Sequence, residues 1–313
     1  MGYDKGGGLI GGKRSVESMK RRLGKEGYQK MKENIGKKAM RALREKYGSN
    51  LAKRAIQGRI NKRIKKSQEI EAKYNSWFIN NNVMLNTTAV QFSEADKIKE
   101  IKIPNVMSPE LAEEIGVHLG DGCMSKRKNY FSVKTNKIEK DYMVEFLFPL
   151  YKKIYNLSLK LMCLPSVSGF EICSRGLCEF KNKALNLPYG EKIHKIEIPH
   201  QVLDSRNKEI YRACIRGLFD TDGHLAVIKS KNNYPTISIT IKSEKLILQV
   251  KEMLTNLGFI VYAGKWVINI NGRFMVEKWR REIGSNNPKN QLKLEQTLSL
   301  KTTQSSSNQA RIV

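Results

Sequence analysis

The clearest pattern of hydrophobic and polar positions lies at residues 237–242, where isoleucine alternates with serine, threonine and lysine. Such alternation predicts a half-buried strand with one apolar and one polar face. Residues 131–136 show a similar pattern, with phenylalanine and valine on the apolar side. In both places apolar residues at helical spacing follow the strand. The chain therefore contains the same strand–helix unit twice.

The predicted helices that follow these strands have start and stop signals. Ser243 is placed to cap one helix, and Gly258 is placed to end it. In the first copy, Asn136 and Glu139 have the spacing of a capping box. Pro149 should kink the helix of that copy.

Each copy closes with two more alternating strands and a last helix, which Met275, Trp279 and Ile283 mark in the second copy. A helical run precedes the first strand of each copy and ends in glycine and acid residues, "IGVHLGDG" at 115–122 and "IRGLFDTDG" at 215–223. Each copy thus reads helix, two strands, helix, two strands, helix. The pattern predicts an α+β fold of two pseudo-symmetric αββαββα repeats with antiparallel sheets.

Composition divides the rest of the chain. The 313 residues carry a formal charge of +27, which indicates a polyanionic partner such as nucleic acid. The N-terminal part has 22 Lys and Arg against seven acids, and glycines punctuate short predicted helical pieces. The expected organisation is a basic helical nucleic-acid-binding extension at 1–75, a connector at 76–100, repeat 1 at 101–195, repeat 2 at 196–300, and a disordered tail at 301–313.

Two further features bear on location. No apolar run approaches the roughly 20 residues of a membrane span. The five scattered cysteines form no CxxC pair and fit a reducing intracellular compartment, cytoplasmic or organellar. We expect no membrane partner.

The two glycine–acid endings resemble the signature of the LAGLIDADG homing endonuclease family, and the resemblance covers roughly residues 101–295. It implies two saddle-shaped sheets and a monomer that carries both motifs in one chain. The residues in register with the signature are glycines and acids: Gly217, Asp220, Asp222 and Gly223 in the second copy, and Gly116, Asp121 and Gly122 in the first.

The chemistry of these residues agrees with the resemblance. Gly116 and Gly217 would let the two motif helices pack closely, so that Asp121 and Asp222 meet at their ends. Two carboxylates at two helix C-termini are unfavourable unless a cation lies between them. Hard oxygen ligands favour Mg²⁺, or Mn²⁺ in its place. The resemblance implies that these two acids bind metal and catalyse a double-strand break in DNA with short 3′ overhangs.

Other residues near the motifs have expected roles. The carbonyl groups of Gly120 and Thr221 could also face the metal. The family uses basic residues near the cleavage centre, and Lys192 and Lys289 are the catalytic candidates because each follows the last helix of its repeat.

Two motif positions differ from this catalytic pattern. The counterpart of Asp220 in the first copy is Leu119, so Asp220 is expected to be supporting rather than catalytic. His118 replaces an aliphatic residue and is expected to be buried between the helices.

The polar strand faces are the expected surface for duplex DNA. The two repeats differ there, which predicts a long asymmetric target. The candidate contacts are Ser125, Lys126, Arg127, Lys128, Ser132, Lys134 and Lys160 in repeat 1, and Lys229, Lys231, Ser238, Thr240, Lys242, Asn269 and Asn271 in repeat 2.

Alternatives follow from the same residues. The chain lacks the terminal residues of a splicing element, so we expect a free-standing, intron-encoded protein rather than an intein. The degenerate first motif and the basic arm leave a cleavage-deficient nucleic-acid-binding protein open, either an intron RNA maturase or a transcription regulator. Intron RNA is an alternative ligand for residues 1–75.

Overall fold

The computed structural model describes residues 7–228 and 234–299, and it divides into two compact units, residues 1–62 and 63–313. In the first unit, helix α1 (Gly7–Tyr47) is broken at Gly24, whose φ is 67°. A 3₁₀ turn (Gly48–Asn50) separates it from helix α2 (Leu51–Asn75), whose residues from Arg63 onward belong to the second unit. The expected short helical pieces are wrong, because Gly36 and Gly58 lie inside these two helices.

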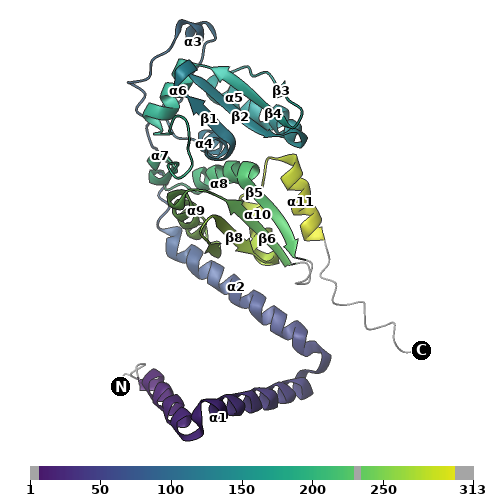
Figure 1. Cartoon of the computed structure of the whole chain (residues 1–313). Coiled ribbons are helices and arrows are strands. Elements are labelled where there is room, and N and C mark those ends of the chain that lie inside the picture. The colour runs from purple at the N-terminus through teal and green to yellow at the C-terminus, as the bar shows by residue number, and fades with distance from the viewer. Residues whose placement is uncertain (1–6, 229–233, 300–313) are drawn as a thin grey trace, which may run out of the picture. The chain divides into compact units, whose positions relative to one another are not determined.

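The second unit contains the connector and both repeats (Figure 1). Its first half runs through α3 (Glu94–Ile98), α4 (Pro109–Asp121), β1 (Gly122–Ser125), a 3₁₀ turn (Lys126–Lys128), β2 (Tyr130–Asn136), a 3₁₀ turn (Lys137–Glu139), a π-helical turn (Tyr142–Leu147), α5 (Phe148–Tyr155), β3 (Met162–Cys163), β4 (Val167–Cys173), α6 (Arg175–Glu179) and a π-helical turn (Phe180–Ala184).

The second half runs through α7 (His200–Asp204), α8 (Lys208–Asp222), β5 (Gly223–Ile228), β6 (Tyr234–Thr240), α9 (Glu244–Asn256), β7 (Val261–Ala263), β8 (Val267–Asn271), α10 (Arg273–Glu282) and α11 (Pro288–Ser299). No helix in the described ranges is long and apolar enough to cross a membrane.

The two sheets have the same topology. Their strand orders are β1-β2-β4-β3 and β5-β6-β8-β7, and all neighbouring strands are antiparallel. The apolar side chains Phe131 and Val133 in the first sheet, and Ile237 and Ile239 in the second, are fully buried. On the polar side of the same strands, Ser132 and Ser238 are also buried, at 3% and 7% exposure. The expected α+β fold of two αββαββα repeats with an N-terminal helical extension is confirmed.

The local capping signals are confirmed only in part. Ser243 does cap α9 by accepting a hydrogen bond from the backbone N–H of Leu246. Asn136 caps a single 3₁₀ turn, but the capping box with Glu139 is wrong, because that carboxylate bonds to distant residues instead. Pro149 lies in the first turn of α5, directly after a π-helical turn.

Candidate metal centre and nucleic-acid interface

Helices α4 and α8 lie side by side where the two repeats meet (Figure 1). The contact is between backbones. A Cβ atom on Gly116 would clash with the carbonyl oxygen of Cys214, and one on Gly217 would clash with the carbonyl oxygen of Glu113. Glycine at these two positions therefore allows the helices to approach closely, as expected from the sequence.

The close packing extends to the helix ends. A Cβ atom on Gly120 would clash with the side chain of Thr221 and lie 3.2 Å from Oδ2 of Asp222. Burial raises the pKa of Asp121 to about 7, and the negative charge of Asp222 acts in the same direction. Burial also raises the pKa of Asp222, although the nearby Lys192 ammonium opposes this. The two motif acids thus form one electrostatically coupled, partly buried pair.

Lys192 lies at the same helix end. Its ammonium group donates to the carbonyl oxygens of His118 at 3.0 Å and Leu119 at 3.1 Å, and also to that of Gly120. Burial lowers the pKa of Lys192, while Asp222 and Asp121 oppose this. The structure therefore brings a cation, two acids and the carboxyl end of α4 together.

Lys289 belongs to a neighbouring cluster. Its Nζ lies 2.9 Å from Oε1 of Glu139, which also accepts a hydrogen bond from the amide of Asn287 at 3.1 Å. Glu139 is close enough to Asp121 to contribute to the raised pKa of that acid. Sequence reasoning missed Glu139, because the capping pattern around Asn136 gave it a local role.

Asp220 is buried and has a defined set of partners. Its carboxylate accepts hydrogen bonds from the hydroxyl of Ser285 and, at 2.7 Å, from the backbone N–H of Asn286. Its own carbonyl accepts from the amide of Asn287 at 3.0 Å. Burial raises the pKa of Asp220 to about 7 despite these bonds. Asp220 thus contacts the loop that leads to Lys289.

His118 lies in the core of the first repeat. It is 1% exposed, and its ring stacks on that of Phe131 with 5.5 Å between centroids. Burial lowers the pKa of His118 well below its usual value, and the charges of Lys181 and Lys192 act in the same direction. The imidazole is therefore neutral at physiological pH.

The candidate DNA contacts occupy the polar strand faces and adjacent turns. Ser238 and Asn269 are cross-strand neighbours joined by a 2.7 Å hydrogen bond, and Lys134 pairs with Glu171 at 2.7 Å. Lys229 and Lys231 lie outside the described residues, as does the tail at 301–313. The other candidates with exposed side chains are Lys126, Arg127, Lys128, Lys160, Thr240 and Lys242.

The donor set fits a hard divalent cation in part. Among the residues that the structure describes, no group of three or more His, Cys, Asp or Glu side chains could hold a metal ion. Asp121 and Asp222 would offer carboxylate oxygens, whereas the Gly120 carbonyl oxygen already accepts a hydrogen bond from Lys192. Mg²⁺ commonly keeps several waters and uses only one or two carboxylates together with substrate phosphates. The pair therefore suits a cation shared with a phosphate group.

Part of the second repeat matches a known family model. Residues 209–277 match the family model of the LAGLIDADG-like domain, which spans most of α8, both central strands of the second sheet and part of α10. The matched range contains the second motif, and it supports the resemblance for that repeat.

Solved structures similar to this chain include homing endonucleases. A structure of mesophilic variants of I-DmoI is 18% identical and covers 61% of this chain and 98% of that one, with a TM-score of 0.39. I-WcaI bound to its DNA recognition sequence is 14% identical, covers 67% of this chain and 94% of that one, and has a TM-score of 0.44.

A curated relative matches a shorter region. This relative, an A-type ATP synthase subunit from Pyrococcus abyssi (strain GE5 / Orsay), is 26% identical over 170 residues, which is 54% of this chain. The match spans only 15% of the length of that protein.

Proposed function

We propose that this protein is a homing-type endonuclease that makes a metal-dependent double-strand break in a long asymmetric DNA target. The observation that carries the proposal is the juxtaposition of Asp121 and Asp222 at the ends of two helices in backbone contact. A raised pKa on such a pair means that its full charge is stable only beside a cation. Solved homing endonucleases similar to this chain include I-DmoI in complex with DNA and Mn.

Asp121 and Asp222 would hold Mg²⁺ or Mn²⁺, with the carbonyl groups of Gly120 and Thr221 as further donors. When bound, the metal would lower the pKa of a water molecule and neutralise charge on the phosphodiester. The two acids would also be held in place by the helix contact, so little reorganisation is needed when the substrate binds.

The two lysines differ in what they contact. Lys192 already lies beside both acids, so we assign it to offset negative charge that develops on the phosphate. Lys289 is paired with Glu139, whose charge acts on Asp121, and the loop before Lys289 is held by Asp220.

Cleavage of the uninterrupted insertion locus tests the proposal. Purified protein is incubated with duplex DNA that carries this locus, with Mg²⁺ and with EDTA. We expect a double-strand break in Mg²⁺ alone. Asp121→Asn and Asp222→Asn should each abolish the break and leave DNA binding intact, whereas the exposed-site variant Asp141→Asn should cleave normally. Tight binding without cleavage at every protein concentration would disprove the nuclease assignment.

One observation favours a second candidate. The Lys192 ammonium group contacts three carbonyl oxygens at the position where a cation is expected, so the acid pair is already partly compensated. A cleavage-deficient LAGLIDADG protein that binds DNA or intron RNA would need no more than this. Metal titration separates the two: Mn²⁺ should bind the endonuclease and not the binding protein, and Asp222→Asn should remove that binding.

We also propose a partner and a compartment. With a net charge of +27, the protein is proposed to act as a monomer on double-stranded DNA inside the cell, in the cytoplasm or an organelle. Residues 1–75 would contribute to nucleic-acid binding.

A further inference from the structure

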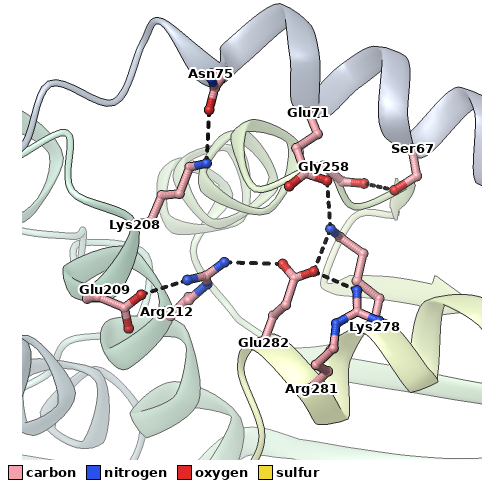
Figure 2. A network of polar contacts seen from close by, with 10 residues as sticks. All are labelled: Ser67, Glu71, Asn75, Lys208, Glu209, Arg212, Gly258, Lys278, Arg281 and Glu282. Atoms are coloured by element: carbon pink, nitrogen blue, oxygen red, sulfur yellow. Dashed lines mark hydrogen bonds and ion pairs between the residues drawn. The ribbon is translucent and has the colours of Figure 1, made fainter.

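The last part of α2, from Arg63 to Asn75, is packed on the second repeat (Figure 2). The Ser67 hydroxyl is buried and donates to the carbonyl oxygen of Gly258 at 2.6 Å. Lys278, which is 3% exposed, lies 3.1 Å from Glu71 and 2.8 Å from Glu282. These directional polar contacts fix the helix in one register on the repeat.

The polar network continues away from α2. Arg212 lies 3.4 Å from Glu282 and 2.6 Å from Glu209, and Lys208 donates to the amide oxygen of Asn75 at 3.2 Å. Both α8 and α10 therefore contribute residues to the surface on which α2 packs. The contacts bind α2 to the repeat that carries Asp222.

Arg63 occupies a second contact, at one corner of the sheet. Its Nη1 donates to the carbonyl oxygen of Asn271 at 2.6 Å, and its guanidinium group lies over the ring of Tyr234, 5.8 Å from the centroid. Gly272 has a φ of 91°, and a Cβ atom there would clash with Arg63 and lie 2.8 Å from the Tyr234 hydroxyl. The glycine thus leaves the space that Arg63 fills.

Strand register places this corner at the far end of the sheet from the acid pair. Gly223, which directly follows Asp222, pairs with Ile239, whereas Ile228 pairs with Tyr234. At about 3.3 Å per residue, β5 carries the chain roughly 17 Å away from Asp222. Arg63 is therefore at the outer end of the second sheet.

The corner is continuous with the face proposed to contact DNA. Thr236 and Asn271 are paired across strands and joined by a 3.0 Å hydrogen bond on that face. Lys65 and Lys66, on α2 next to Arg63, are exposed. Residues 1–62, which are joined to Arg63 through the peptide chain, contain 18 Lys and Arg against five acids.

We infer that α2 and the basic residues before it bind the phosphate backbone of duplex DNA on one side only, in the flank beyond the half-site contacted by the second repeat. The inference rests on the proposed DNA binding of the sheets. Duplex DNA is favoured over RNA because a rigid duplex lying along the second sheet would continue past the Arg63 corner. The target would then be longer on that side of its centre.

Site-specific photocrosslinking maps the contact without relying on cleavage. A duplex is enriched for binding from a random-core library in Ca²⁺, and cleavage is scored separately in Mg²⁺. Benzoylphenylalanine is introduced at Lys66, at Thr240 on the sheet, and at Lys102 as the control. Lys102 is exposed, and its backbone N–H bonds to Tyr155 at the end of α5, away from the strands.

We expect adducts from position 66 in the flank on the same side of the centre as those from position 240, and farther out. Position 102 should give none. Absence of adducts from position 66, or adducts on the first-repeat side, would overturn the inference. Adducts with an added RNA and none with the duplex would also overturn it, and failure to enrich any duplex would disprove the DNA-binding proposal itself.

Salt dependence gives an independent measure. Each phosphate contact contributes about 0.9 to the slope of log K against log salt. Lys65→Gln together with Lys66→Gln should therefore reduce the slope by roughly 1.8, while Lys99→Gln with Lys102→Gln, which also removes two exposed charges, should leave it unchanged. Equal changes in both double variants would contradict a localised contact.

Discussion

The two repeats share a topology but stabilise their cores in different ways. Seven residues before Asp121 stands Glu114, and seven residues before Asp222 stands Ile215. Glu114 forms a fully buried ion pair with Lys181 and accepts hydrogen bonds from Tyr151 at 2.5 Å and Tyr155 at 2.9 Å.

In the second repeat, aromatic side chains pack together beneath α8 and α10. Trp279 is fully buried, and its ring lies 5.0 Å from that of Phe219 and 5.9 Å from that of Phe259. Both cores contain aromatic rings, and the difference is that the first repeat also buries an ion pair where the second has Ile215. The stability of the first repeat should be more sensitive to substitution, because loss of one partner of its ion pair leaves a buried charge alone.

The largest effect is expected from breaking the polar core. Lys181→Met should lower the free energy of unfolding by about 3–5 kcal/mol, because Glu114 would keep a buried negative charge without its cation. Urea unfolding followed by circular dichroism measures this. Lys183→Met, at an exposed lysine two residues away, should cost far less.

The double variant sharpens the comparison. Glu114→Ile with Lys181→Met removes both buried charges and should recover part of the lost stability, although the buried hydroxyls of Tyr151 and Tyr155 lose their acceptor. A double variant no more stable than Lys181→Met would show that the polar cluster has no apolar equivalent in this repeat.

The acid pair should make stability depend on pH. Because the folded pKa of Asp121 is about 7 against an ordinary value of 3.8, its stabilising contribution is full below the unfolded pKa and is lost as pH rises through 7. In EDTA at about pH 8, Asp121→Asn should therefore be more stable than the parent by roughly 2–4 kcal/mol. The difference should be much smaller near about pH 5.

Denaturant titrations at the two pH values check this, with the exposed-site variant Asp141→Asn as control. Added Mg²⁺ should stabilise the parent and not Asp121→Asn, since only the parent keeps both acids. A parent whose stability does not fall between these pH values would contradict a coupled acid pair.

A smaller effect should follow from making the second motif like the first. Asp220→Leu copies Leu119 and removes the acceptor of Ser285 and of the Asn286 backbone N–H. We expect a loss of about 1–3 kcal/mol. Hydrogen exchange should become faster at residues 285–289, while residues 186–192 of the first repeat serve as the internal control. Unchanged exchange at 285–289 would show that Asp220 does not hold that loop.

The smallest effect concerns the contacts between α2 and the second repeat. In the described part of the chain, the first repeat has no such helix packed on it. Glu71→Gln should cost less than about 1 kcal/mol, because Glu71 is partly exposed and Lys278 retains Glu282. Ser67→Ala should cost about 1 kcal/mol, since it removes a buried hydrogen bond. Thermal unfolding measures both, and a global loss of several kcal/mol would mean that the repeat depends on α2 for its fold.

The sequence predicted what depends on periodicity and on short motifs. Alternation at 237–242 predicted β6 because its isoleucines pack into the core, and Gly116 and Gly217 predicted the helix contact because nothing larger fits. The buried pair of Glu114 and Lys181 could not be predicted, since its partners lie 67 residues apart.

The same limit explains the errors at the site. The partners of Glu139, Asn287 and Lys289, lie 148 and 150 residues later in the chain, so the sequence around Glu139 indicated only a local capping role. The hydrogen bond between Ser67 and Gly258 joins residues that lie 191 positions apart. Helix α2 itself has few apolar positions that would indicate which of its faces is covered. Polar contacts between residues so far apart in the chain leave no periodic pattern in the sequence.

The contact between α4 and α8 has a consequence for how such a protein can change. The spacing of Asp121 and Asp222 is set by main-chain atoms that meet at two glycines, and no side chain lies between them at those points. The strand faces, in contrast, are built from side chains that substitution can replace one at a time. On the proposed function, the recognised sequence could therefore drift while the distance between the two cuts stays the same.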